Sequence, residues 1–169
     1  MDRRVEASAK KTPRTARGGS VGRRNLPLML LQAREGLLQH FRPIFHRFGL
    51  TEQQWRILRV VSDHARLEQH EIVSFCQISG PSLSNILSRL EEIGYVTRER
   101  SKEDHRKVFV MLGRRGQVLV GDVAPYVDAR YRELERALGT ELMSSLFTVL
   151  DRLLSLPLEP AERSAGRPK

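Results

Sequence analysis

Residues 79–112 hold the pattern that most restricts the fold of this chain: an amphipathic helix, a glycine stop and two short alternating segments joined by a basic turn. Ser79 is a helix-capping residue type, and Pro81 falls in the first helical turn, where the missing N–H of proline costs nothing. Gly94 predicts the end of the helix. The apolar side chains recur at helical spacing and predict one buried face, made of Leu83, Ile86, Leu87, Leu90 and Ile93.

The other face of this helix has short polar side chains and one arginine, namely Ser82, Ser84, Asn85, Ser88 and Arg89. Such side chains can approach the edges of DNA bases closely and offer both donors and acceptors. An ordinary solvated helix could have the same composition, so the helix alone leaves both interpretations open.

The segment after Gly94 favours the DNA interpretation. Tyr95–Arg100 and Lys107–Leu112 alternate as strands, and Ser101–Arg106 predicts a turn between them. A recognition helix followed by a basic β-ribbon is a winged helix. Residues 68–76 predict a further helix before it, which completes a helix-turn-helix. Eight Lys/Arg stand against five Asp/Glu over residues 79–115, so the pattern argues for DNA more strongly than the charge does.

The net charge of the chain is +9, which suggests a polyanionic partner, nucleic acid before membrane. Residues 1–24 hold eight Lys/Arg and two Asp/Glu and almost nothing to bury, so we expect a disordered segment there. It is either a basic arm along DNA or a solubilising tail. One cysteine excludes an intramolecular disulfide and fits a cytoplasmic protein, and no apolar run is long enough for a membrane span.

The rest of the chain predicts a mainly α fold with a small β-ribbon. A helix over about 26–48 should bend or break near Pro43. Thr51 and Gln54 predict a capping box at the start of a helix that ends near His64. Thr140 is expected to cap the last helix, which follows one over about 114–137, and residues 157–169 are expected to form a flexible tail. The helix over about 68–76 should bury Ile72, Val73, Phe75 and Cys76.

We expect one domain over residues 25–156, with the winged helix over about 51–112 and flanking helices over about 26–48 and 114–156. The flanking helices have apolar stripes with no obvious core to cover them. We therefore predict that they are dimerisation helices, which pack against their copies in a second subunit. A monomeric accessory bundle is the alternative.

The layout resembles the MarR family of winged-helix regulators over residues 26–156, and within it the subgroup of homoprotocatechuate-degradation operon regulators. The resemblance rests on five motifs in order: residues 30–35 (LLQARE), 41–43 (FRP), 50–57 (LTEQQWRI), 81–84 (PSLS) and the pair Asp104-x-Arg106. It implies a homodimeric repressor on a pseudopalindromic operator in double-stranded DNA.

In the wings of this family, the arginine matching Arg106 enters the minor groove and the aspartate matching Asp104 holds it. Two positions depart from the family. His105 stands where arginine is usual, which predicts a wing that binds more weakly or responds to pH. Gly113 replaces a capping threonine, which predicts some loss of local stability. The predicted DNA-binding residues are Ser82, Ser84, Asn85, Ser88, Arg89, Lys102, Asp104, His105, Arg106 and Lys107.

The resemblance also implies a cleft for a small aromatic carboxylate between the dimerisation helices and the DNA-binding lobe. A flat apolar wall and a bidentate cation are what such an acid needs. The candidate effector-binding residues are Arg34, His40, Trp55, Arg59 and Asn85. Core packing for Trp55 and a surface ion pair for Arg34 are the competing interpretations.

Enzyme signatures are absent, so we predict no catalytic residue and no cofactor. His70 and Glu71 begin like a zinc-protease motif, but Ser74 stands where the second histidine is needed. The spacing of the histidines predicts no metal site, and Cys76 is expected to be a structural thiol. The sequence therefore predicts a cytoplasmic repressor of genes for aromatic-compound catabolism. An effector-independent global or architectural repressor is the alternative, and a helical interaction module that does not bind DNA is a more distant one.

Overall fold

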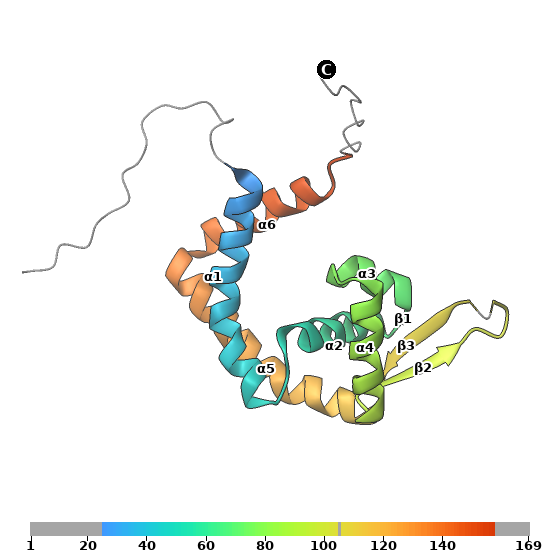
Figure 1. Ribbon diagram of the computed structural model, residues 1–169. Helices are drawn as coiled ribbons and strands as arrows, with labels where there is room; N and C mark the ends of the chain where they lie inside the picture. Colours follow the sequence, from blue (N-terminus) through green and yellow to red (C-terminus); the bar gives the residue numbers. More distant parts are fainter. Residues whose placement is uncertain (1–24, 105, 158–169) are drawn as a thin grey trace, which may run out of the picture. The chain divides into compact units, whose positions relative to one another are not determined.

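The computed structural model describes residues 25–104 and 106–157 of the chain (Figure 1). Its elements are α1 (Leu26–Arg47), α2 (Glu52–His64), β1 (Arg66–Glu68), α3 (Gln69–Cys76), α4 (Gly80–Glu92), β2 (Val96–Arg100), β3 (Val108–Leu112), α5 (Arg114–Leu138) and α6 (Thr140–Leu154). The expected basic arm, His105 and all but the first residue of the expected tail lie outside the described residues. Two compact units meet within α1, after Leu38, and each is described by itself.

The three strands form an antiparallel sheet in the order β1-β3-β2. The expected ribbon is present as β2 and β3, which pair from Val96 opposite Leu112 to Arg100 opposite Val108. The sequence reading missed β1, which pairs with the other edge of β3 and places Glu68 opposite Phe109. A strand of three residues is too short to show an alternating pattern, so its pairing with β3 is what defines it.

One apolar core lies between α2, α3, α4, the sheet and the first half of α5. Leu83, Leu87 and Leu90 of α4 are fully buried in it, as the helical spacing predicted. The last half of α1 joins this core through aromatic rings. Phe45 stacks on Trp55 with ring centres 5.7 Å apart, and Phe41 meets Tyr131 at 5.0 Å.

The helix starts follow local rules. The capping box at α2 is present, because Gln54 N donates to Thr51 Oγ1 at 3.2 Å and Thr51 N donates to Gln54 Oε1 at 2.8 Å. Ser79 caps α4 as expected, although the bond from Ser82 N is long at 3.4 Å. Gly94, with a φ of 76°, ends the turn after α4, where L-residues with side chains are disfavoured.

Several local predictions were wrong. Of the bend or break expected at Pro43, the break is excluded, because α1 continues to Arg47. Thr140 is the first residue of α6 rather than its cap, because the chain turns at Gly139, with a φ of 84°. The buried face of α3 is narrower than predicted, since Ile72 and Cys76 are buried, Val73 is half-buried and Phe75 is 54% exposed. Phe75 packs on His64 instead, with ring centres 4.8 Å apart.

The face of α4 is also narrower than the spacing suggested. Ile86 is half-buried and Ile93, at the end of the helix, is exposed. No helix of the described part of the chain is long and apolar enough to cross a membrane.

Candidate nucleic-acid interface

The predicted polar face of α4 is accessible. Ser82, Asn85, Ser88 and Arg89 are exposed, and Ser84 is half-buried. The three buried leucines of α4 fix the opposite face in the core. The rotation of the helix about its axis is therefore set by packing, and the polar side chains are directed outward without any ligand to order them.

The side chains beside α4 restrict how its serines can bind. Ser79 Oγ lies 2.9 Å from Ser82 Oγ. Gln69 Nε2, at the start of α3, donates to Ser84 Oγ at 2.9 Å. These contacts leave Ser82 and Ser84 with defined neighbours, whereas Asn85 and Arg89 are exposed.

Arg98 of β2 ties the last half of α4 to the sheet. Its Nε and Nη2 both donate to Glu91 Oε2, at 2.8 and 2.5 Å, and Nη2 also donates to Ser88 Oγ at 3.4 Å. The hydrogen bond from Arg98 lowers the pKa of the Glu91 carboxyl. Because an arginine can only donate, Ser88 must accept from it, and its own O–H remains able to donate outward. Sequence reasoning missed Arg98, since it is separated from Ser88 by ten residues and belongs to a different element.

The wing tip is a turn held by short-range hydrogen bonds. Ser101 Oγ accepts from the backbone N–H groups of Glu103 and Asp104, both at 3.2 Å. Lys107 N donates to Asp104 O at 2.9 Å, and Ser101 N donates to Lys107 O at 3.0 Å. These bonds define the path of the chain on both sides of the tip.

The expected pair between Asp104 and Arg106 is present. Asp104 Oδ1 accepts from the backbone N–H of Arg106 at 3.0 Å and lies 3.6 Å from Arg106 Nε. The Arg106 side chain is 96% exposed. Lys102 is exposed as well. Asp104 therefore orders the backbone of the tip and leaves the guanidinium in solvent, where a polyanion can reach it.

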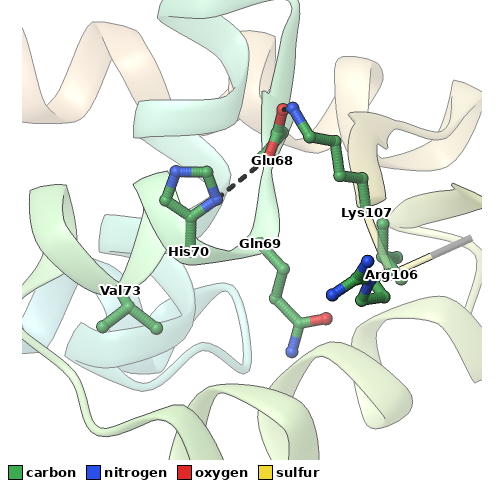
Figure 2. A pocket seen from close by; sticks show the side chains of 7 residues that line it. Glu68, Gln69, His70, Val73, Arg106 and Lys107 are labelled. Carbon is green, nitrogen blue, oxygen red and sulfur yellow. Dashed lines mark hydrogen bonds and ion pairs between the residues drawn. The ribbon is translucent and has the colours of Figure 1, made fainter. Parts of the chain in front are cut away.

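Lys107 has a different environment from the one expected of a phosphate contact. Its Nζ donates to Glu68 Oε1 at 2.9 Å, and this bond raises the pKa of the lysine. His70 Nδ1 lies 3.0 Å from the other oxygen, Glu68 Oε2. Figure 2 shows Lys107 and His70 converging on Glu68 from two sides, with Arg106 and Gln69 beside them. An open pocket of about 360 Å³ lies there, lined by Glu68, Gln69, His70, Val73, Arg106, Lys107 and Val108.

The candidate effector residues have separate surroundings. Trp55 is 8% exposed and stacks on Phe45, so core packing accounts for most of its surface. Arg59 Nη2 pairs with Asp63 Oδ1 at 3.1 Å. Arg34 and His40 are exposed on α1, and Asn85 is exposed on α4. Within the described residues, no hydrogen bond or ion pair joins Arg59 to Asn85.

Metal and thiol chemistry find little support in the part of the chain that the structure describes. No group of three His, Cys, Asp or Glu side chains there could hold a metal ion. Cys76 is fully buried, and burial raises the pKa of its thiol. A buried thiol with a raised pKa is a poor nucleophile, as expected of a structural cysteine.

A helix with an accessible polar face, anchored by buried leucines and flanked by a ribbon with an exposed arginine at its tip, defines a winged-helix DNA-binding protein. Comparison with known proteins identifies the family. A model described as the MarR family matches residues 48–107. The homoprotocatechuate degradative operon repressor of Escherichia coli is 36% identical over 132 residues, which cover 78% of this chain and 89% of that protein. The chain belongs to the MarR family of transcriptional regulators.

Three further matches agree. The HTH-type transcriptional regulator FarR of Neisseria gonorrhoeae is 38% identical over 127 residues, covering 75% of this chain and 87% of that protein. The crystal structure of NadR in complex with 4-hydroxyphenylacetate matches with a TM-score of 0.71 at 35% identity, covering 86% of this chain and 99% of that one. The crystal structure of the transcriptional regulator PA4135 matches with a TM-score of 0.78 at 33% identity, covering 82% of this chain and 100% of that one. The protein is thus a transcriptional repressor of this family and not an enzyme.

Proposed function

We propose that this protein is a homodimeric repressor whose two α4 helices and two wings bind a pseudopalindromic operator, and that a small aromatic carboxylate releases it. The single observation that supports DNA binding best is the pairing of two accessible elements in one lobe. The polar face of α4 suits a major groove, and Arg106 at the wing tip suits the adjacent minor groove.

The experiment for DNA binding compares Arg106→Ala with Arg136→Ala. Both substitutions remove one exposed arginine, but Arg136 lies on α5 rather than on the wing. The probe is a duplex selected by the wild-type protein from a random pool. We expect Arg106→Ala to weaken binding about 10- to 150-fold, because a lost hydrogen bond from a charged group costs about 1.5–3 kcal/mol.

The Arg106→Ala variant should also lower the slope of log affinity against log salt by about one unit if a phosphate contact is lost. Arg136→Ala should change neither quantity, and Lys11→Ala, in the basic segment, should weaken binding less than Arg106→Ala. Equal small losses in all three variants would mean that the wing does not dock on DNA.

Exposed apolar side chains support the dimer. α6 has none of its residues buried, although Leu142, Phe147, Val149 and Leu154 are large and apolar. The first part of α1 similarly exposes Leu26, Leu28, Met29, Leu30, Leu31 and Leu37. Obligate interfaces commonly bury about 2,000 Å² or more, and such surfaces supply the apolar area. Sedimentation at micromolar concentration should give twice the chain mass, and a stable monomer would contradict both the dimer and the palindromic operator.

Two relatives support an aromatic acid as the effector, since NadR was crystallised with 4-hydroxyphenylacetate and the E. coli relative is named for homoprotocatechuate degradation. Arg34 is the cation that we propose for the carboxylate, with Trp55 as part of the apolar wall. In one state of the dimer the two recognition helices are aligned for DNA, and in the other they are misaligned. If the acid binds the misaligned state more favourably by ~3 kcal/mol, operator affinity falls on the order of 100-fold. Successive major grooves require a separation of about 34 Å, so a small shift is sufficient.

The effector test titrates 4-hydroxyphenylacetate and pyridine carboxylates against the protein–operator complex. Release of wild type and of Arg152→Ala, but not of Arg34→Ala, supports the proposed site, provided that Arg34→Ala binds the operator normally. If Arg34→Ala responds like wild type, the acid binds elsewhere. If no aromatic acid acts at millimolar concentration, the effector-independent repressor becomes the better description.

A further inference from the structure

Consecutive residues at the start of α3 contact both of the elements that we propose to read DNA. Glu68, the last residue of β1, accepts from Lys107 Nζ at the base of the wing, at 2.9 Å. Gln69, the first residue of α3, donates to Ser84 Oγ on α4, at 2.9 Å. Neither residue was predicted from the sequence to take part in the interface, and neither needs to contact DNA itself.

The wing needs a support of this kind. Backbone pairing between β1 and β3 ends with Glu68 opposite Phe109, and pairing between β2 and β3 ends with Arg100 opposite Val108. Arg106 lies beyond both. Lys107 lies next to the last strand pair, where one further backbone bond, from Ser101 N to Lys107 O, continues the ribbon. The Glu68 carboxylate binds the Lys107 side chain from outside the β2–β3 ribbon. The direction in which Arg106 projects therefore depends on a side-chain contact as well as on the sheet.

Glu68 is well fixed for this task. Its side chain is only 16% exposed, and its two oxygens contact different residues, Lys107 and His70. Its backbone N–H donates to Glu71 Oε2 at 2.7 Å, which holds the residue at the end of β1. Figure 2 shows this carboxylate at the end of the Lys107 side chain, with a dashed line joining it to His70.

The sign of its charge is the reason to assign Glu68 a role. A carboxylate close to a DNA-binding surface repels phosphate and lowers affinity for every DNA sequence alike. A fixed negative charge at this position opposes simple electrostatic binding, and its contact with Lys107 occupies one of the three donors of that lysine.

We propose that Glu68 and Gln69 are positioning residues that set the spacing between the wing and the recognition helix, and that this spacing favours the operator over other DNA. The proposal rests on the proposed DNA-binding function. In this proposal Lys107 supports the wing through its bond with Glu68 and is not an independent phosphate contact.

The test compares Glu68→Gln with Glu99→Gln. Glu68 and Glu99 lie on opposite edge strands and both pair across the sheet with Phe109. In the described part of the chain the Glu99 side chain has no hydrogen bond or ion pair, so its substitution removes the same charge without removing a contact. Binding is measured to two duplexes, one selected by the wild-type protein and one of the same composition with shuffled sequence.

The two explanations predict opposite signs. If Glu68 only adds negative charge, Glu68→Gln should bind both duplexes more tightly, as Glu99→Gln should. If it positions the wing, Glu68→Gln should bind the selected duplex at least ~10-fold less tightly, which corresponds to the loss of about one charged hydrogen bond. It should bind the shuffled duplex at least as tightly as wild type. Tighter binding of the selected duplex by Glu68→Gln would overturn the proposal.

Additional variants separate positioning from misfolding and from the proposed function. The thermal midpoint of Glu68→Gln should stay close to that of Glu99→Gln. Lys107→Met and Glu68→Gln should not add in their effects on the selected duplex, whereas Lys107→Arg should retain most affinity. Gln69→Met and Ser84→Ala should behave in the same non-additive way. A wild-type protein that selects no duplex would refute the proposed function; additive losses from Glu68 and Lys107 would refute only the positioning role.

Discussion

Gly116→Ala should destabilise this protein, although alanine is the better helix former by about 1 kcal/mol. Gly116 is buried in the first turn of α5, where the helix meets the residue after the turn that ends α4. A Cβ placed there would overlap the carbonyl oxygen of Tyr95 and lie 2.9 Å from its carbonyl carbon and 3.2 Å from its Cα. All of these are backbone atoms, so no rotamer change can remove the overlap.

The magnitude follows from two opposing effects. Forcing one methyl group into a packed site typically costs about 1–3 kcal/mol, and a backbone contact belongs at the upper end of that range. After the gain in helix propensity is subtracted, we expect a net loss of about 2 kcal/mol in the free energy of unfolding. Gly121 is the matched control, because it lies in the same helix and a Cβ there meets nothing within 4 Å.

The assay is urea unfolding followed by the fluorescence of Trp55, the single tryptophan, which is buried. Protein concentration must be the same for all variants, because the proposed dimerisation would contribute to apparent stability. Gly121→Ala should be as stable as wild type or more stable by up to about 1 kcal/mol. If Gly116→Ala is stabilised like Gly121→Ala, the close approach of α5 to Tyr95 is not a real constraint.

Three other predictions follow from single sites. Gly113→Thr should lower the thermal midpoint even though it supplies a capping oxygen, because a Cβ at Gly113 would lie 2.5 Å from Gly94 O; an unchanged or higher midpoint would contradict this steric reading. Cys76 should react slowly with iodoacetamide at pH 8 in the native protein and quickly in urea, since burial raises the pKa of its thiol; equal rates would mean that the thiol is accessible. Glu91→Gln should lose stability relative to wild type above the ordinary pKa of 4.5, and the difference should shrink as the pH falls through the lowered pKa of Glu91. Melting curves at constant ionic strength test this, and a difference that persists at low pH would assign the effect to packing.

Local signals made much of the fold predictable. The caps at Thr51 and Ser79, the stop at Gly94 and the three buried leucines of α4 all depend on residues within a few positions of one another. Gly113 shows where such reasoning fails. A missing capping threonine predicted only a loss of stability, whereas the structure requires a residue without a side chain beside Gly94.

The parts of the interface that the sequence did not reveal depend on distant pairs. Glu68 and Lys107 are 39 positions apart, and Gln69 and Ser84 are 15 apart. β1 is too short to show a period, so the strand that brings Glu68 to the wing gave no signal. The prediction that Phe75 is buried was wrong for a related reason. An eight-residue helix has too few turns for the spacing of apolar residues to show whether Phe75 lies in the core or packs on His64. The candidate effector residues come from three helices. The spacing of residues within one helix does not predict how far that helix lies from the other two.

The contacts around α4 also restrict how an effector could act. Gln69 binds the first half of this helix, Arg98 binds its last half, and α5 meets the turn after it through Gly113, whose N–H donates to Tyr95 O at 3.0 Å. The wing is joined to the start of α3, and so to these contacts around α4, through the bond between Lys107 and Glu68. Moving α4 alone would break several of these contacts together, whereas a rigid rotation of the lobe breaks none of them. We therefore expect an effector to change the separation of two intact lobes in the dimer, so hydrogen exchange of the Tyr95 and Gly113 amides should be the same with and without the acid. Faster exchange at these amides on adding the acid would instead mean that release begins inside the lobe.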